Sequence, residues 1–146
     1  MKQGIYTITE NRPLTADVWE MRLSGDTSPL TAPGQFINIK LEGFFLRRPI
    51  SVCDWDKAGL TIIYKVVGRG TAAMAAMAPG QALDVLAGLG NGFDVGKCGQ
   101  RTLVIGGGAG VPPMYGLAKA LLAAGKTPVA ILGFNTRSEI FYEERF

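Results

Sequence analysis

The stretch Leu46-Arg47-Arg48-Pro49-Ile50-Ser51 places two adjacent arginines and a rigid proline at the start of an expected β-strand. Guanidinium groups bind phosphate oxygens through paired hydrogen bonds of fixed geometry. The Ser51 hydroxyl adds a further hydrogen-bonding group for a phosphate or for the polar edge of a ring. The stretch therefore predicts an anion site beside a strand. A solvated basic loop leading into an edge strand is the alternative that these residues alone leave open.

Short apolar runs separated by turn residues surround this stretch. Runs rich in β-branched and aromatic residues predict strands, and Gly, Pro, Asn and Asp between them predict turns. Six short strands at close spacing are typical of a small antiparallel barrel or sandwich. The expected strands are Gly4–Glu10, Asp17–Leu23, Gln35–Leu41, Ile50–Trp55, Leu60–Val67 and Ala82–Ala87.

A second element suited to phosphate follows the fifth of these runs. Gly68 and Gly70 precede Thr71–Ala78, an alanine- and methionine-rich run that predicts a short helix with Thr71 as its N-cap. The N–H groups and the dipole of a helix N-terminus face an anion there. An ordinary glycine turn with a threonine cap is the alternative.

The pattern changes after residue 98. Arg101–Ile105 is an apolar run typical of a strand buried on both faces of a parallel sheet. A glycine cluster follows, then a predicted helix, Pro112–Ala124, capped by Gly125, and a second strand, Pro128–Gly133. A further helix is expected from Ser138 to Phe146, with Ser138 as its cap. We therefore predict a barrel domain over 1–98 and the first part of a parallel-sheet nucleotide-binding domain over 99–146.

The glycine cluster Gly106-Gly107-Gly108-Ala109-Gly110 lies where a pyrophosphate loop is expected, between a strand and a helix. The dinucleotide fingerprint is imperfect, because Val111 stands at the third glycine position and Asn135-Thr136-Arg137 replaces the usual acidic residue. Two strands and one helix do not make a self-sufficient sheet. We expect a partial domain, completed by further chain or by a partner.

Composition excludes several classes of function. The net charge is only +3 and the basic residues are scattered, which argues against nucleic acid as a partner. There is no histidine and only Cys53 and Cys98, so neither a disulfide framework nor a Cys/His zinc site is expected. No apolar run is long enough to span a membrane, and the N-terminus does not read as a signal peptide. The cytoplasm is the expected compartment.

Taken in order, five short motifs resemble one family. The chain is similar to the electron-transfer subunits of NAD-dependent (class B) dihydroorotate dehydrogenase, within the ferredoxin-reductase superfamily. The resemblance runs from about residue 3 to the last residue, and its specificity lies in the order and spacing of the motifs. The motifs are Arg48-Pro49-Ile50-Ser51, Ile63-Tyr64-Lys65, Gly70-Thr71, Leu89-Gly90-Asn91-Gly92-Phe93 and Gly106-Gly107-Gly108-Ala109-Gly110-Val111-Pro112.

This resemblance implies a flavoprotein of electron transport in pyrimidine biosynthesis. In that family the barrel holds FAD, the α/β domain receives NAD(H), and a C-terminal four-cysteine segment binds a [2Fe–2S] cluster. The partner is the FMN-containing catalytic subunit of dihydroorotate dehydrogenase, in a heterotetramer. The resemblance implies these contacts: FAD with Arg48, Pro49, Ile50, Ser51, Ile63, Tyr64 and Lys65, the FAD pyrophosphate with Gly70 and Thr71, and the nicotinamide nucleotide with Gly106, Gly107, Gly108 and Gly110.

The chain also departs from the family pattern. The second half of the nucleotide domain and the cysteine segment are missing, so this chain alone is not expected to complete the electron path. No side chain is assigned a catalytic role, because hydride chemistry belongs to the cofactor. Two alternatives stay open: a related subunit of the ferredoxin:NADP reductase type, and a non-catalytic docking module whose incomplete sheet pairs with a partner.

Overall fold

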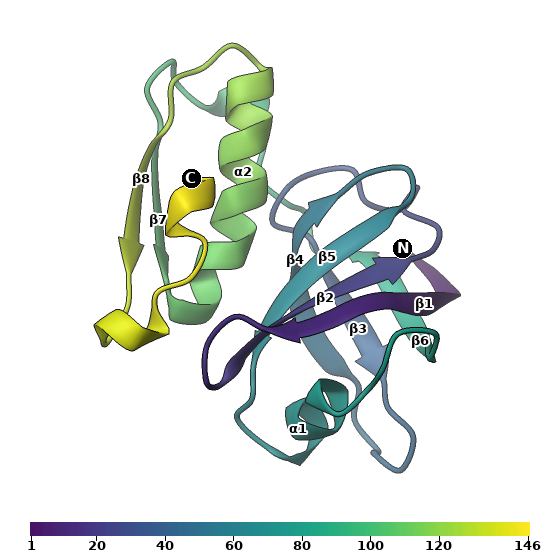
Figure 1. Cartoon of the computed structure of the whole chain (residues 1–146). Coiled ribbons are helices and arrows are strands. Elements are labelled where there is room, and N and C mark those ends of the chain that lie inside the picture. Colours follow the sequence, from purple (N-terminus) through teal and green to yellow (C-terminus); the bar gives the residue numbers. More distant parts are fainter.

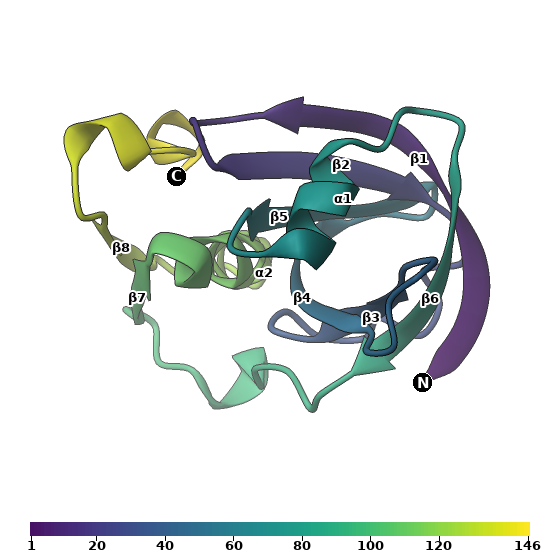
Figure 2. The same ribbon diagram turned by 90° about the horizontal axis from the view of Figure 1, so that it is seen from below.

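A computed structural model describes all residues from 1 to 146 and shows a six-stranded barrel beside a smaller α/β unit (Figure 1). The barrel strands pair antiparallel in the closed order β1-β2-β5-β4-β3-β6. Figure 2 shows them as a ring, with the short helix α1 (Arg69–Ala75) across one end. The strands are β1 (Lys2–Pro13), β2 (Val18–Ser24), β3 (Phe36–Lys40), β4 (Arg48–Trp55), β5 (Gly59–Lys65) and β6 (Ala82–Leu89).

Alternation along the strands fills the barrel. Successive side chains point to opposite faces of a strand, so every second residue enters the interior. On β5, for example, Ile62 and Tyr64 are buried in the barrel core, whereas Ile63 between them packs outward against the α/β unit. The largest fully buried side chains are Tyr6, Ile8, Met21, Leu23, Ile37, Ile39, Leu60, Ile62 and Met74, with Leu121 in the α/β unit.

The pairing of β4 with β5 is incomplete. The two strands are in register only at Val52↔Ile62, Asp54↔Thr61 and Trp55↔Leu60. Beyond Val52, β4 pairs only with β3, and beyond Ile62, β5 pairs only with β2. Arg48–Ser51 and Ile63–Lys65 thus each present one strand edge that no neighbouring strand covers.

The α/β unit consists of two parallel strands and one long helix. β7 (Leu103–Gly107) pairs in parallel with β8 (Val129–Gly133), and α2 (Val111–Ala123) joins them and covers one face of the pair. This order confirms the predicted fold class, an antiparallel barrel followed by the start of a parallel nucleotide-binding sheet. The predicted boundary between residues 98 and 99 stays a prediction. It lies just after a 3₁₀ turn, η1 (Val95–Lys97).

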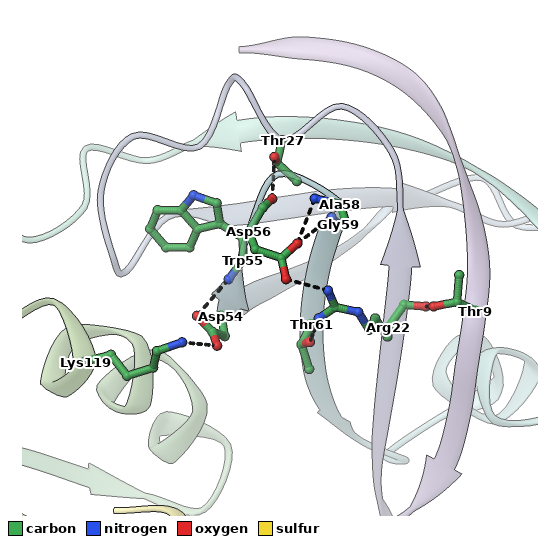
Figure 3. Close-up of polar contacts among 10 residues, drawn as sticks. All are labelled: Thr9, Arg22, Thr27, Asp54, Trp55, Asp56, Ala58, Gly59, Thr61 and Lys119. Atoms are coloured by element: carbon green, nitrogen blue, oxygen red, sulfur yellow. Dashed lines mark hydrogen bonds and ion pairs between the residues drawn. The ribbon is translucent and has the colours of Figure 1, made fainter.

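Helix α2 packs directly on the outside of β4. A Cβ atom at Gly116 would lie 2.6 Å from the carbonyl oxygen of Cys53, so only glycine permits this approach. On the next turn, Lys119 donates to the carboxylate of Asp54 (Figure 3). Beside this contact, the Asp56 carboxylate accepts a hydrogen bond from the Arg22 guanidinium at 2.7 Å (Figure 3). Its other oxygen accepts the backbone N–H of Gly59 and so closes the turn between β4 and β5.

A small buried apolar cluster joins the barrel to the α/β unit. Val18, Cys53 and Ile63 come from the barrel, and Val111 and Phe141 come from the α/β unit. All five are buried. The wall of the barrel and the start of α2 are therefore held at a fixed spacing.

The outer face of the two-stranded sheet is apolar and uncovered. Leu103, Ile105, Val129 and Ile131 are 54%, 63%, 45% and 51% exposed. Their register pairs Leu103 with Val129 and Ile105 with Ile131, so the four side chains share one face. A parallel sheet normally has helices on both faces, and here only one face has one.

Three local predictions were wrong. α1 begins at Arg69 with Gly68 as its N-cap, and Thr71 is its third residue. The predicted helix over Ser138–Phe146 is instead two 3₁₀ turns, η3 (Arg137–Glu139) and η4 (Glu143–Arg145). The first of these is capped by Thr136 rather than by Ser138. The left-handed conformation of Tyr142, with φ 63°, interrupts the run between the turns.

None of the helices combines the length and the hydropathy needed to cross a bilayer.

Candidate functional site

Arg48 and Gly70, which lie far apart in the sequence, meet at one end of the open edge of β4. A Cβ atom on Gly70 would overlap the guanidinium of Arg48. The same guanidinium stacks 5.1 Å from the centre of the Phe44 ring. One of its nitrogens donates to the carbonyl oxygen of Leu46 at 2.6 Å, and no carboxylate pairs with it. A half-buried cation without an acidic partner, held over the start of a helix, is suited to an anionic ligand.

Arg47 has a different role. Its guanidinium pairs with Asp84 on β6 at 3.0 Å and also donates to the carbonyl oxygen of Asn38 at 3.2 Å. These contacts tie the start of β4 across to the neighbouring strands. Of the two adjacent arginines, only Arg48 keeps its charge available for a ligand.

The Thr71 hydroxyl is committed to its own turn. It accepts the backbone N–H of Val67 at 3.0 Å and donates to the carbonyl oxygen of Gly68 at 3.1 Å. The side chain is buried. Thr71 therefore shapes the loop before α1, and its hydroxyl is already engaged within that loop.

A cavity of about 350 Å³ lies between the barrel and the α/β unit. It opens where the edge of β5 faces the loops that follow β7 and β8. Its walls are mostly apolar on the barrel side and glycine-rich on the other. The lining residues are Val18, Ile63, Tyr64, Lys65, Gly107, Gly108, Ala109, Gly133, Phe134, Asn135, Glu139 and Phe141.

The three predicted residues of β5 all border this cavity but differ in orientation. Ile63 packs outward in the cluster between the two units. Tyr64 points into the barrel core, where its hydroxyl donates to Asn11 at 2.9 Å and burial raises the pKa of the phenol to about 12. The Tyr64 side chain therefore points away from the cavity, and Tyr64 borders the cavity through its main chain. Lys65 is half-buried and reaches the rim, where it pairs with Asp17 and Glu139.

Pro49, Ile50 and Ser51 form the facing edge of β4. Ile50 packs against the barrel core. Ser51 is two residues before Cys53, which faces the α/β unit, so strand alternation points Ser51 to that side. These residues do not line the cavity itself. They lie next to Arg48 on the edge of β4 that β5 leaves uncovered.

The predicted glycines after β7 divide into two groups. Gly107 and Gly108 line the cavity, and the φ of 48° at Gly108 suits glycine. Gly106 is buried, and a Cβ there would lie only 2.9 Å from the carbonyl oxygen of Gly110. Gly106 and Gly110 thus shape the loop, and Gly107 and Gly108 present its surface.

The N-terminus of α2 offers few donors to a phosphate. Pro112 and Pro113 occupy its second and third positions, where the backbone N–H groups would otherwise be free. The loop therefore allows close approach of a ligand without the strong anion binding of an ordinary dinucleotide fold.

Sequence reasoning missed the contribution of the last residues to the cavity, notably Phe134, Glu139 and Phe141. A signal for one of them was present. Thr136-Arg137-Ser138-Glu139 has the spacing of a capping box, and the structure shows the Glu139 carboxylate on the Thr136 N–H at 3.0 Å. This hydrogen bond closes a turn at residues 136–139, and the other oxygen of the Glu139 carboxylate accepts a hydrogen bond from Lys65 of the barrel.

Comparison with known proteins gives consistent results, although no family model matches the chain. The chain is 41% identical to the dihydroorotate dehydrogenase B (NAD(+)) electron transfer subunit of Geobacillus sp. (strain WCH70), over 100% of this chain and 60% of that protein. It is 43% identical to the same subunit of Bacillus caldolyticus, over 96% of this chain and 58% of that protein. The chain therefore spans about three fifths of the length of these curated relatives.

Solved structures show the same fold. An NADH-dependent reduced ferredoxin-NADP oxidoreductase superposes with a TM-score of 0.85 at 28% identity, covering 97% of this chain and 52% of that one. The ferredoxin reductase of carbazole 1,9a-dioxygenase superposes with a TM-score of 0.86 at 25% identity, covering 96% and 46%. By sequence, the chain is homologous to part of the electron transfer subunits of dihydroorotate dehydrogenase B, and it shares its fold with ferredoxin reductases.

Proposed function

We propose that this chain is the flavin-binding part of an electron-transfer subunit that passes electrons between NAD(H) and a dihydroorotate dehydrogenase catalytic subunit. The observation that carries the proposal is the open edge between β4 and β5, which ends at an unpaired Arg48 over Gly70. The identity of about 41% with named electron transfer subunits supports the assignment of the reaction.

The residues present fit FAD. A pyrophosphate needs a cation and close approach to backbone, and Arg48 beside Gly70 supplies both. A flavin ring needs a mostly apolar slot with backbone hydrogen-bonding groups at its edge. The uncovered edges of Arg48–Ser51 and Ile63–Lys65 supply these groups, and the adjoining cavity supplies the space. We infer that the predicted FAD contacts lie along this line.

Bound FAD would supply hydride acceptance and the release of single electrons. The residues of this chain do the rest. Arg48 holds the phosphates, and the main chain of β4 and β5 orients the ring. Gly107 and Gly108 let a nicotinamide approach the ring closely. Phe134 and Phe141 border the same cavity and exclude water from it.

The remaining partners follow from the resemblance and are proposed on that ground. Two cysteines cannot supply the four thiolates of a [2Fe–2S] cluster, and Cys53 is buried in the contact with α2. We place the cluster outside residues 1–146. We further propose an FMN-containing catalytic partner in a heterotetramer and a cytoplasmic location, as in the family that the chain resembles.

A binding experiment tests the proposal first. FAD titrated into the purified chain should lose fluorescence with saturation at one flavin per chain, and NADH should then bleach the visible absorbance of the bound flavin. A chain that retains no FAD at saturating concentration would refute the proposed function. Electron delivery to dihydroorotate dehydrogenase is then tested with a subunit that also carries the cluster-binding segment, by adding the catalytic subunit and following orotate formation from dihydroorotate with NAD⁺.

The second candidate is a reductase subunit serving another electron carrier. The likeness to an NADH-dependent reduced ferredoxin-NADP oxidoreductase, at 28% identity, favours it. Ferredoxin reduction without stimulation of a dihydroorotate dehydrogenase partner would select this candidate. A comparison of NADH with NADPH would separate the nucleotide preferences.

A further inference from the structure

Three charged groups meet at the rim of the cavity. The Lys65 ammonium lies 3.1 Å from the Oδ2 atom of Asp17 and 3.4 Å from the Oε1 atom of Glu139. Lys65 is the last residue of β5, Asp17 precedes β2, and Glu139 ends the turn η3 of the α/β unit. The ion pair between Lys65 and Glu139 therefore bridges the two units that form the cavity.

The carboxylate of Glu139 is anchored independently of Lys65. Its second oxygen, Oε2, accepts the backbone N–H of Thr136 at 3.0 Å and the Thr136 hydroxyl at 3.2 Å. Its first oxygen, Oε1, is left for Lys65. Lysine, by contrast, ends in a flexible four-carbon stem with three rotatable donors. The Glu139 carboxylate is therefore fixed by Thr136, whereas the position of the flexible Lys65 side chain depends on its ion-pair partners.

Glu139 and Lys65 both line the cavity, whereas Asp17 does not. Hydrogen bonds to Asp17 first and to Glu139 second raise the pKa of Lys65, so its ammonium stays charged over the physiological range. The cavity thus holds one fixed negative charge and one positive charge that the negative one orients. In a partly enclosed site such charges act on a ligand more strongly than they would in water.

We propose that Glu139 is a positioning residue that draws the Lys65 ammonium onto its own carboxylate at the cavity rim and thereby lowers the redox potential of FAD bound there. The inference rests on the proposed function. Reduction adds negative charge to a flavin, so a nearby ammonium stabilises the reduced form and a carboxylate that competes for the ammonium weakens this effect. Glu139 then keeps the potential lower than Lys65 alone would make it.

The substitution Glu139→Gln tests this directly. Glutamine keeps a carbonyl oxygen for the Thr136 cap but loses the charge that attracts Lys65. The chain carrying E139Q should bind reduced FAD in preference to oxidised FAD by on the order of tenfold more than wild type, which for a two-electron couple is about 30 mV to higher potential. The potential is measured by reduction against a reference dye, and affinity for oxidised FAD is measured by fluorescence.

A double-mutant comparison separates positioning from the direct field of the carboxylate. Lys65→Met should lower the potential, and E139Q should raise the potential by less in the Lys65→Met background than in the wild-type background. Glu144→Gln removes an equal charge from the neighbouring turn, at an exposed residue that does not line the cavity and has no ion pair. It should leave the potential at the wild-type value.

The outcomes are distinct. An unchanged potential in E139Q overturns the inference while leaving FAD binding intact. An equal shift in the wild-type and Lys65→Met backgrounds shows that the carboxylate acts directly and also overturns the positioning role. Failure of the wild-type chain to bind FAD refutes the proposed function and this inference with it. Circular dichroism of each variant verifies that the fold is retained.

Discussion

Replacement of Arg48 by alanine is the sharpest test of the phosphate site. Arg48 is half-buried, has no carboxylate partner and lies over Gly70, so its loss removes a charge-assisted contact without breaking an internal ion pair. Such contacts contribute about 1.5–3 kcal/mol. At about 1.4 kcal/mol for each factor of ten, FAD affinity should fall by about 10- to 150-fold. Because the guanidinium is partly exposed to solvent, we expect the lower half of this range.

The assay is a fluorescence titration of FAD into wild-type, Arg48→Ala and Arg48→Lys chains. Lysine keeps the charge but loses the planar fork of donors, so its affinity should lie between the other two. Arg101→Ala is the matched control, because Arg101 is exposed and unpaired in the segment before β7. Affinity of Arg48→Ala within about twofold of wild type would show that the arginine is only a surface charge, against the contribution expected of a phosphate contact.

Three further predictions concern other parts of the chain. Gly70→Val should displace the guanidinium above it and weaken FAD binding, whereas Gly68→Ala, which has open space around it, should not; titration of both variants measures the difference. Burial raises the pKa of the Cys53 thiol to about 12, so at pH 8 it stays protonated and a thiol reagent should modify only the partly exposed Cys98; two fast-reacting thiols in the native chain would contradict this. The uncovered apolar sheet face should make the chain associate with rising concentration, and Ile105→Glu should reduce that association in sedimentation experiments; a wild-type chain that stays monomeric throughout would oppose the expectation.

Most of the fold could be predicted because its signals are local. Strand alternation and turn residues identified all six barrel strands, and the strand–glycine–helix–strand order identified the α/β unit. The helix predicted over Ser138–Phe146 failed because Thr136 and Glu139 close a turn first and Tyr142 then adopts a left-handed conformation. Whether an apolar and charged run continues as a helix depends here on tertiary contacts, since the Tyr142 hydroxyl bonds the buried Glu20 of β2.

The candidate site was only partly predictable for a different reason. The order of the motifs in the sequence predicted Arg48, Gly70 and Ile63–Lys65 as site residues. The direction in which each side chain points depends on how the strands pair, which the sequence does not give. Tyr64 points into the barrel, and Arg47 is taken up by Asp84. Neither fact has a local signal. The cavity also includes Glu139, which becomes a neighbour of Lys65 only when the two units pack together.

The incomplete pairing between β4 and β5 has a consequence for how a ligand enters. Strand pairs on every other side of the ring keep the barrel closed, and three register positions hold β4 to β5 at their far ends. A cofactor can therefore bind along these open strand edges from outside, without entering the packed interior of the barrel. Once seated, its polar edge would replace the missing rungs of the ladder. Bound flavin would then stabilise the fold as well as carry electrons, and its loss should increase local opening at β4 and β5 before any other part of the barrel.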